Sequence, residues 1–145
     1  MIKDKYIVLL ADDSIDDRWF MRKALERSTR LIVGGEVSDG QEAIDYLKGE
    51  GSFHDRTTYP WPDILFVDLK MPRKNGLDVL QWIKSALLPE GVLTVVVSGA
   101  SLEEDVTRSM ALGAAGYFKK SSDRHEQEEM VRQVERLLAD SSAAA

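Results

Sequence analysis

The chain has 145 residues, enough for one domain with a single buried core and too few for a second functional domain. A formal net charge of -6 argues against broad nucleic-acid binding, which needs a basic face. The absence of cysteine excludes disulfides and thiolate chemistry and agrees with a cytoplasmic location.

The N-terminal residues lead directly into a short apolar run, and nothing there resembles a signal peptide. No apolar run approaches the ~20 residues of a membrane-spanning helix. The runs are nearly uninterrupted and rich in β-branched residues, which is typical of strands that helices cover on both faces. The sequence predicts strands at Tyr6–Leu10, at Leu31–Val33 with Val37 as a weaker strand, and at Ile64–Val67, Val95–Val97 and Gly116–Phe118.

Helical patterns fill the stretches between these strands. Ser14 is a capping residue at the start of the first helix, and Asp39 and Gly40 open a short second helix that stops at Gly49. Apolar residues at helical spacing predict helices at Ser14–Arg27, Gly76–Ser85, Ser101–Leu112 and Arg124–Ala139. The short second helix carries Ala43, Ile44 and Leu47.

Two segments show no such pattern. Residues 48–62 lack periodicity and contain Pro60 and Pro62, so we expect a long loop of the kind that is often functional or mobile. Residues 141–145 consist of serine and alanine and are expected to form a disordered tail or a cloning remnant. The folded domain is therefore predicted to span residues 1–140.

The alternation of five strands with five helices predicts a doubly wound α/β domain with a parallel sheet and right-handed crossovers. In such sheets the ligand site lies beyond the carboxyl ends of the strands. The residues at those ends are Asp12, Asp13, Asp68, Ser98 and Lys120. Clustered carboxylates repel one another, and a hard cation such as Mg2+ relieves that repulsion. Together with a lysine and a hydroxyl, this set favours phosphoryl transfer to Asp68.

Each of these residues also has a simpler explanation when it is taken alone. Asp12 and Asp13 could be ordinary helix caps, and the Ser98 hydroxyl could bond only to backbone. An aspartyl-phosphate phosphatase of the haloacid-dehalogenase type is disfavoured, since its motif needs a second aspartate where Lys70 stands. A flavin-binding module is disfavoured because Asp12 and Asp13 would repel a phosphate group.

The same positions resemble the receiver domain of two-component response regulators, over Ile7 to Leu138. The match comprises the acid pair, the acceptor in Val67-Asp68-Leu69-Lys70-Met71-Pro72, Gly76 after it, and the hydroxyl, aromatic and lysine positions at Ser98, Tyr117 and Lys120. Lys120 rather than Lys119 is selected because the family's lysine lies three positions after its aromatic residue. The resemblance implies a flavodoxin-like sheet in the order 2-1-3-4-5.

The resemblance also implies a mechanism. A phosphohistidine on a sensor histidine kinase or a histidine phosphotransfer protein would donate its phosphoryl group to Asp68. Mg2+ would be held by Asp13, Asp68 and the backbone carbonyl of Lys70, with Asp12 acting mainly through water. Lys120 would pair with the phosphoryl group, Ser98 would move to bond it, and Tyr117 would turn inward, which makes a two-state switch.

Some residues depart from the common family pattern. Ser121 stands where most receivers have a proline, often with a cis bond, and we expect a trans bond before a serine. Lys70 and Ala100 occupy positions that, in this family, tune the hydrolysis of the aspartyl phosphate, so the resemblance implies a changed lifetime. The long loop before Asp63 and the amino-acid sequence of residues 63–76 resemble those of the stand-alone receivers that partner phytochrome-type kinases.

The expected partners follow from this resemblance. They are a kinase or phosphotransfer protein, a downstream protein target that the sequence does not name, and a second copy of the chain if a homodimer forms through the fourth and fifth elements. We expect no nucleic acid and no membrane among the partners. The alternative is a receiver-like scaffold that is never phosphorylated and works only by binding proteins.

Overall fold

The computed structural model describes residues 4–144 and contains a five-stranded sheet and five α-helices. The strands are β1 (Tyr6–Ala11), β2 (Leu31–Val37), β3 (Ile64–Val67), β4 (Leu93–Ser98) and β5 (Gly116–Lys119). The helices are α1 (Ile15–Glu26), α2 (Gly40–Lys48), α3 (Gly76–Ser85), α4 (Glu103–Ala111) and α5 (Arg124–Ala144), and a short 3-10 helix, η1, spans Gly51–Phe53.

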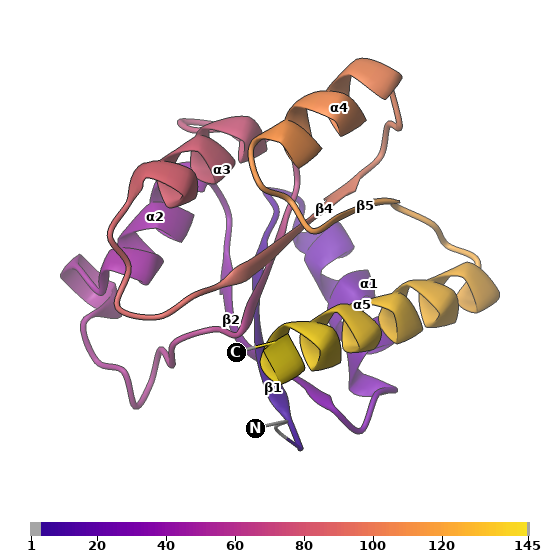
Figure 1. The fold of residues 1–145 in the computed structure, drawn as a ribbon, viewed down its shortest axis with the longest axis horizontal. Coiled ribbons are helices and arrows are strands. Elements are labelled where there is room, and N and C mark those ends of the chain that lie inside the picture. The colour runs from indigo at the N-terminus through magenta and orange to yellow at the C-terminus, as the bar shows by residue number, and fades with distance from the viewer. Residues whose placement is uncertain (1–3, 145) are drawn as a thin grey trace.

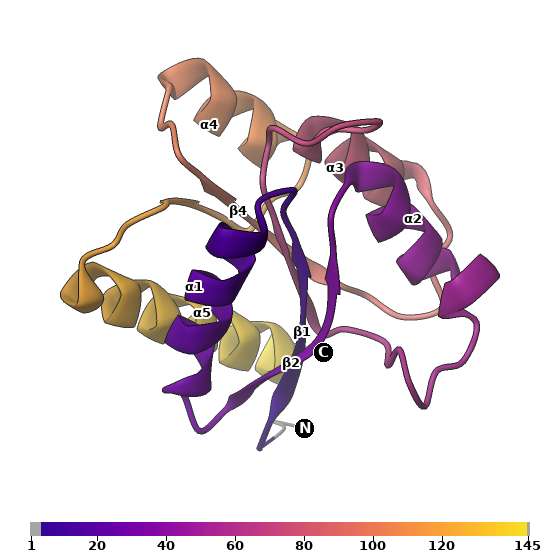
Figure 2. The ribbon, with the colours of Figure 1, turned by 180° about the vertical axis from the view of Figure 1, so that it is seen from behind.

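The strands are parallel and lie in the order β2-β1-β3-β4-β5. This order confirms the expected doubly wound, flavodoxin-like α/β fold. Figures 1 and 2 show α1 and α5 on one face of the sheet, with α2 and α3 on the other. Because every strand runs in the same direction, all five carboxyl ends meet at one edge of the sheet, which is where the candidate site lies.

Two apolar cores form because side chains alternate between the two faces of each strand. In β1, Val8 and Leu10 pack in the core with α1 and α5, whereas Leu9 and Ala11 pack in the core with α2 and α3. The short β3 is buried along its whole length. A central strand covered on both faces fixes the position of the residue that follows it, here Asp68.

The strand β2 is longer than the sequence predicts, because it is continuous across two glycines. The pairing with β1 shifts by one residue at this point, so that Leu9 lies opposite Gly35 and Gly34 is the extra residue of a bulge. A Cβ at Gly34 would lie 2.5 Å from a methyl carbon of Ile7. Glycine therefore lets β2 pass close to β1 where apolar periodicity alone indicates a break.

The loop between α2 and β3 is folded back against the domain by an aromatic cluster. The buried ring of Tyr46 packs at a tilt against Phe53 and edge to face with Tyr59, and its hydroxyl donates a 2.8 Å hydrogen bond to the carbonyl of Pro60. The Arg56 guanidinium lies over Tyr46 and Trp61 and donates to the carbonyl of Leu47 at the end of α2. These contacts are tertiary, so local sequence periodicity could not predict them.

Two helix ends differ by two or more residues from the sequence-based expectation, while both ends of α1 and the end of α4 differ by one. α4 begins at Glu103 rather than Ser101, and its N-cap residue, Leu102, has no side-chain oxygen to cap it. α5 continues to Ala144 rather than stopping at Ala139, since serine and alanine contain no helix breaker. The predicted tail therefore belongs to the helix up to Ala144, and residue 145 lies outside the described residues. Within residues 4–144, no helix is both long enough and apolar enough to cross a membrane.

Candidate functional site

Three carboxylates gather where β1 and β3 end. Asp12 and Asp68 are buried, and their backbone N–H groups donate to Val37 and Ala11, which holds both residues in line with the sheet. Asp13 is exposed beside them. Carboxylate oxygens of Asp12, Asp13 and Asp68 all lie within 4.8 Å of one another. The structure thus brings these three predicted residues together.

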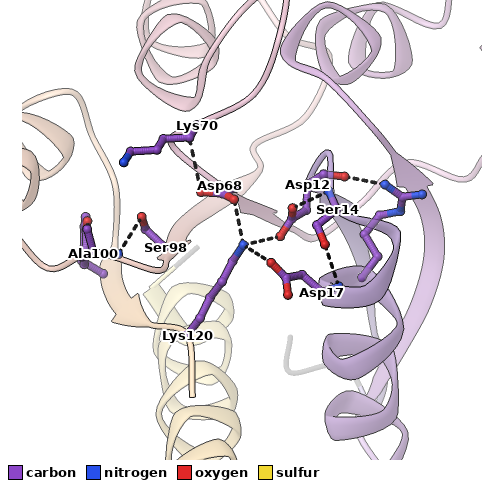
Figure 3. Close-up of polar contacts among 10 residues, drawn as sticks. Asp12, Ser14, Asp17, Asp68, Lys70, Ser98, Ala100 and Lys120 are labelled. Atoms are coloured by element: carbon purple, nitrogen blue, oxygen red, sulfur yellow. Dashed lines mark hydrogen bonds and ion pairs between the residues drawn. The ribbon is translucent and has the colours of Figure 1, made fainter. Parts of the chain in front are cut away.

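The Lys120 side chain reaches into this cluster from the end of β5. Its Nζ lies 2.8 Å from an oxygen of Asp12, 2.8 Å from one of Asp68 and 2.7 Å from one of Asp17 (Figure 3). The Lys120 backbone N–H donates to the carbonyl of Ser98, which fixes the start of the side chain against the end of β4. Lys119 is exposed, as expected.

The charges of this site act on one another. Burial opposes a charge on Lys120, but the hydrogen bonds to Asp12, Asp17 and Asp68 outweigh it and raise the pKa of Lys120 above its ordinary value. Burial raises the pKa of Asp12, and the nearby charge of Asp68 adds to this effect, while Lys120 and the Ser14 N–H act against it. The ammonium is therefore firmly held, and Asp12 takes up a proton more readily than an ordinary aspartate.

Asp17 is the residue of this site that sequence reasoning missed. In the sequence, Asp17 is only an early acidic residue of the first helix, where acids interact favourably with the helix dipole. The available signal was its place in the first turn of the helix that follows the acid pair, close to the carboxyl edge of the sheet. Its contact with Lys120 joins residues 103 positions apart in the chain, and no local pattern indicates that contact.

Ser98 and Tyr117 are linked through the loop that follows β4. The buried Ser98 Oγ accepts a 3.4 Å hydrogen bond from the N–H of Ala100, and the Tyr117 hydroxyl donates a 2.7 Å bond to the carbonyl of the same residue. Burial raises the pKa of Tyr117. The tyrosine hydroxyl therefore has a partner inside the protein instead of pointing freely into water.

The loop from β3 to α3 is tightly built around Asp68. The Lys70 N–H donates to an Asp68 oxygen at 3.3 Å, and Figure 3 shows the Lys70 side chain pointing away from the carboxylates. A Cβ at Gly76 would lie 2.5 Å from the Asp68 carbonyl oxygen, so only glycine fits where the loop closes. Arg73 has a left-handed backbone, with φ of 62°, and forms a bidentate pair with Asp39 at the start of α2.

The segment after Lys120 is held by serine hydrogen bonds. The Ser121 hydroxyl accepts from the N–H of Asp123, and its carbonyl accepts from the Gln127 side chain. No peptide bond in the described part of the chain is cis, so the bond before Ser121 is trans, as expected for a serine.

The acid cluster has the chemistry of a divalent cation site. Three carboxylates at this spacing provide the oxygen ligands that hard cations such as Mg2+ prefer, and a cation would relieve their mutual repulsion. Asp13 in particular is exposed and free to turn toward a cation, because the Lys120 ammonium bonds to Asp12, Asp17 and Asp68.

A cavity of about 340 Å³ lies beside the lysine. Asp17, Asp68 and Lys120 line its polar end, and Phe20, Phe66 and Met130 belong to its apolar part between α1 and α5. A small molecule that enters this cavity meets both the Asp68 carboxylate and the ammonium.

Comparison with known proteins agrees with this geometry. A sequence model of the response regulator receiver domain matches residues 8–132. The chain belongs to the response regulator receiver family. The matched residues include the acid pair, Asp68, Ser98, Tyr117 and Lys120. Receivers of this family are signalling domains whose general partners are histidine kinases.

Individual receivers are similar along most of their length. Response regulator Rcp1 of Synechocystis is 30% identical over 132 residues, which cover 89% of this chain and 86% of Rcp1. The crystal structure of the phosphorylated cyanobacterial phytochrome response regulator RcpA superposes with a TM-score of 0.76 at 29% identity, covering 92% of this chain and 94% of RcpA. The Mn2+-bound form of Rcp1 gives a TM-score of 0.73 at 29% identity, with the same coverage of 92% and 94%. The receiver is thus similar to phytochrome response regulators.

Proposed function

We propose that this receiver accepts a phosphoryl group on Asp68 from a histidine kinase or a histidine phosphotransfer protein. The observation that carries the proposal is the position of the Lys120 ammonium, 2.8 Å from an Asp68 oxygen within a cluster of three carboxylates. An acceptor carboxylate beside a fixed cation and a candidate metal site is the arrangement that phosphoryl transfer requires.

The chemistry is a displacement at phosphorus. A carboxylate oxygen of Asp68 forms a bond to phosphorus as the bond from phosphorus to the histidine nitrogen breaks, and the imidazole leaves with its electron pair. Asp13, Asp68 and the backbone carbonyl of Lys70 would hold Mg2+, with Asp12 acting mainly through water, and the cation would supply positive charge for the phosphoryl oxygens. The Lys120 ammonium would balance part of the negative charge on the phosphoryl oxygens.

The switch is proposed to act through Ser98 and Tyr117. When the phosphoryl group is present, the Ser98 hydroxyl turns to bond one of its oxygens and leaves the N–H of Ala100. The bond from Tyr117 to the carbonyl of Ala100 supports this coupling, because both side chains contact one residue of the loop after β4. A downstream protein would then recognise the changed face near Tyr117, Met110 and α5.

An apolar surface on α1 supports kinase binding next to the site. Ile15, Trp19 and Phe20 are all exposed there, and the rings of Trp19 and Phe20 pack edge to face. Large apolar side chains that remain exposed beside a reactive group favour protein docking. We place the receiver in the cytoplasm with its kinase, and the net charge of -6 supports a role without nucleic acid.

The test is the intact mass of the protein after incubation with acetyl phosphate, with and without Mg2+. We expect a Mg2+-dependent gain of about 80 Da, the mass of one phosphoryl group, in the wild type and in Lys119→Met. Asp68→Ala should show no gain. A wild type that gains no mass under any condition would instead favour the scaffold that is never phosphorylated.

A further inference from the structure

We infer that Asp17 is a positioning residue that competes with the incoming phosphoryl group for the Lys120 ammonium. Through this competition Asp17 sets the donor concentration at which the receiver becomes phosphorylated. The inference rests on the proposed function and adds a regulatory element to the same site.

The first argument is the bonding capacity of the lysine. An ammonium group has three N–H donors, and three carboxylate oxygens lie 2.7 to 2.8 Å from Nζ of Lys120. Its capacity is therefore filled before any phosphoryl group arrives. One carboxylate has to give way before Lys120 can bond a phosphoryl oxygen.

The second argument concerns which carboxylate leaves. The side chains of Asp12 and Asp68 are 13% and 9% exposed and belong to the candidate metal cluster, whereas the Asp17 side chain is 42% exposed. The backbone of Asp17 is held separately, because its N–H donates to the Ser14 hydroxyl that caps α1. The Asp17 carboxylate can thus turn into water at low cost without loosening the helix.

The third argument is the location of the pair. Asp17 and Lys120 line the cavity that opens beside Asp68. A donor that approaches through this cavity carries negative charge on its phosphoryl oxygens. It meets the Asp17 carboxylate at the ammonium it needs, so Asp17 opposes its entry both by occupying the lysine and by charge repulsion.

The experiment measures initial phosphorylation rates over a range of acetyl phosphate concentrations at saturating Mg2+. Asp17→Asn keeps the size of the side chain and removes its charge. We expect this variant to need a donor concentration about three- to fivefold lower for half-maximal rate, the scale of a partly exposed ion pair, with a smaller change in maximal rate. Asp17→Glu, which retains the carboxylate, should behave like the wild type.

Asp16→Asn is the matched control, because it makes the same charge change on the adjacent, exposed residue of α1. Equal decreases of the half-maximal donor concentration in Asp16→Asn and Asp17→Asn would overturn the inference, since the change in net charge alone would explain them. A higher half-maximal concentration in Asp17→Asn would also overturn it, because Asp17 would then support Lys120 instead of competing for it. Absence of any mass gain in all proteins, wild type included, would overturn the proposed function and this role together.

Discussion

Lys120 is the residue that makes the carboxylate cluster compatible with a folded protein. Asp12 and Asp68 are buried, and the cost of burying their charges is offset by the ammonium 2.8 Å from each of them. The Lys120 side chain is only 23% exposed, so water compensates poorly for its loss.

Replacing Lys120 with Met should destabilise the domain, because two buried carboxylates lose their cation. Removal of one partner of a buried pair costs about 3–5 kcal/mol, and we expect about 1–3 kcal/mol here because the site is partly open to water. Urea unfolding at pH 7 measures the loss. Lys119→Met makes the same charge change at an exposed position and should unfold almost like the wild type.

The pH dependence of stability at this site follows from the pKa shifts of Lys120 and Asp12. The pKa of Lys120 is raised above its ordinary value of 10.5, so its contribution is fully present below pH 10.5 and is lost as the pH rises through the raised pKa. The pKa of Asp12 is also raised, so this carboxyl group takes up a proton above pH 3.8. The free energy of unfolding of Lys120→Met should therefore approach that of the wild type as the pH falls from 7 toward 4. A difference between the two free energies that stays constant over this range would contradict this account.

Mg2+ should stabilise the protein through Asp13. A ligand that binds only the folded state adds about 1.4 kcal/mol at ten times its dissociation constant, which raises the melting temperature. Asp13→Asn should lose most of this shift, and because Asp13 is exposed the variant should fold normally without metal. Asp16→Asn removes a neighbouring charge and should keep the shift. Equal Mg2+ responses in the two variants would argue against the Asp13 site.

At the scale of elements, the loop from β3 to α3 holds the acceptor by close backbone packing. Gly76 begins α3, and its N–H donates to the carbonyl of Leu69. Asn75 caps the helix through a reciprocal pair of bonds with Asp78. The loop is therefore fixed at both ends, and the backbone around Asp68 has little freedom.

Gly76→Ala should be destabilising although alanine favours helices. The added Cβ would lie 2.5 Å from the Asp68 carbonyl oxygen and 2.9 Å from Leu69 Cα, and backbone atoms cannot easily move. We expect a cost of about 1–3 kcal/mol in chemical denaturation, typical of overpacking. Gly91→Ala is the control, because a Cβ there meets nothing within 4 Å. Similar unfolding of the two variants would contradict the steric argument.

The predictability of these elements depends on how local their causes are. The helix predicted at Gly76–Ser85 has the same bounds as α3, because the apolar spacing that predicts it is a local pattern within the helix itself. The bulge at Gly34 and the packing of Arg56 over Tyr46 arise from contacts between distant segments, and the sequence did not predict them. The site shows the same division, since Asp12 and Asp68 follow from strand ends and Lys120 from the family's spacing, whereas Asp17 depends on how far the Lys120 side chain reaches.

At the scale of the whole molecule, stability is distributed unevenly. The central strands β1, β3 and β4 are covered on both faces, while α4 buries only Ser109 of its nine residues. Figures 1 and 2 both show α4 projecting beyond the rest of the domain. A helix with so little buried surface gains little from packing, and helices of this length are marginal by themselves in water.

Hydrogen exchange should therefore be fastest, among the five helices, in α4. Local opening of an element requires only the free energy of its own contacts, and those of α4 are few. Mass-spectrometric exchange on the unmodified protein measures this, with α2, which buries five residues, as the internal comparison. Protection of α4 equal to that of α2 would show that α4 opens only when the whole domain unfolds.

The aromatic surface of α1 gives the protein an optical probe of its own. Trp19 is 46% exposed and lies two residues after Asp17, with the Lys23 ammonium 5.5 Å from its ring. Trp61 and Trp82 are instead partly buried in the core on the opposite face of the sheet. Indole emission depends on polarity and on nearby charge, so a displacement of Asp17 or the docking of a partner would alter the signal of Trp19 first. Replacement of Trp61 and Trp82 by Phe would isolate that signal and let binding at α1 be followed without an added dye.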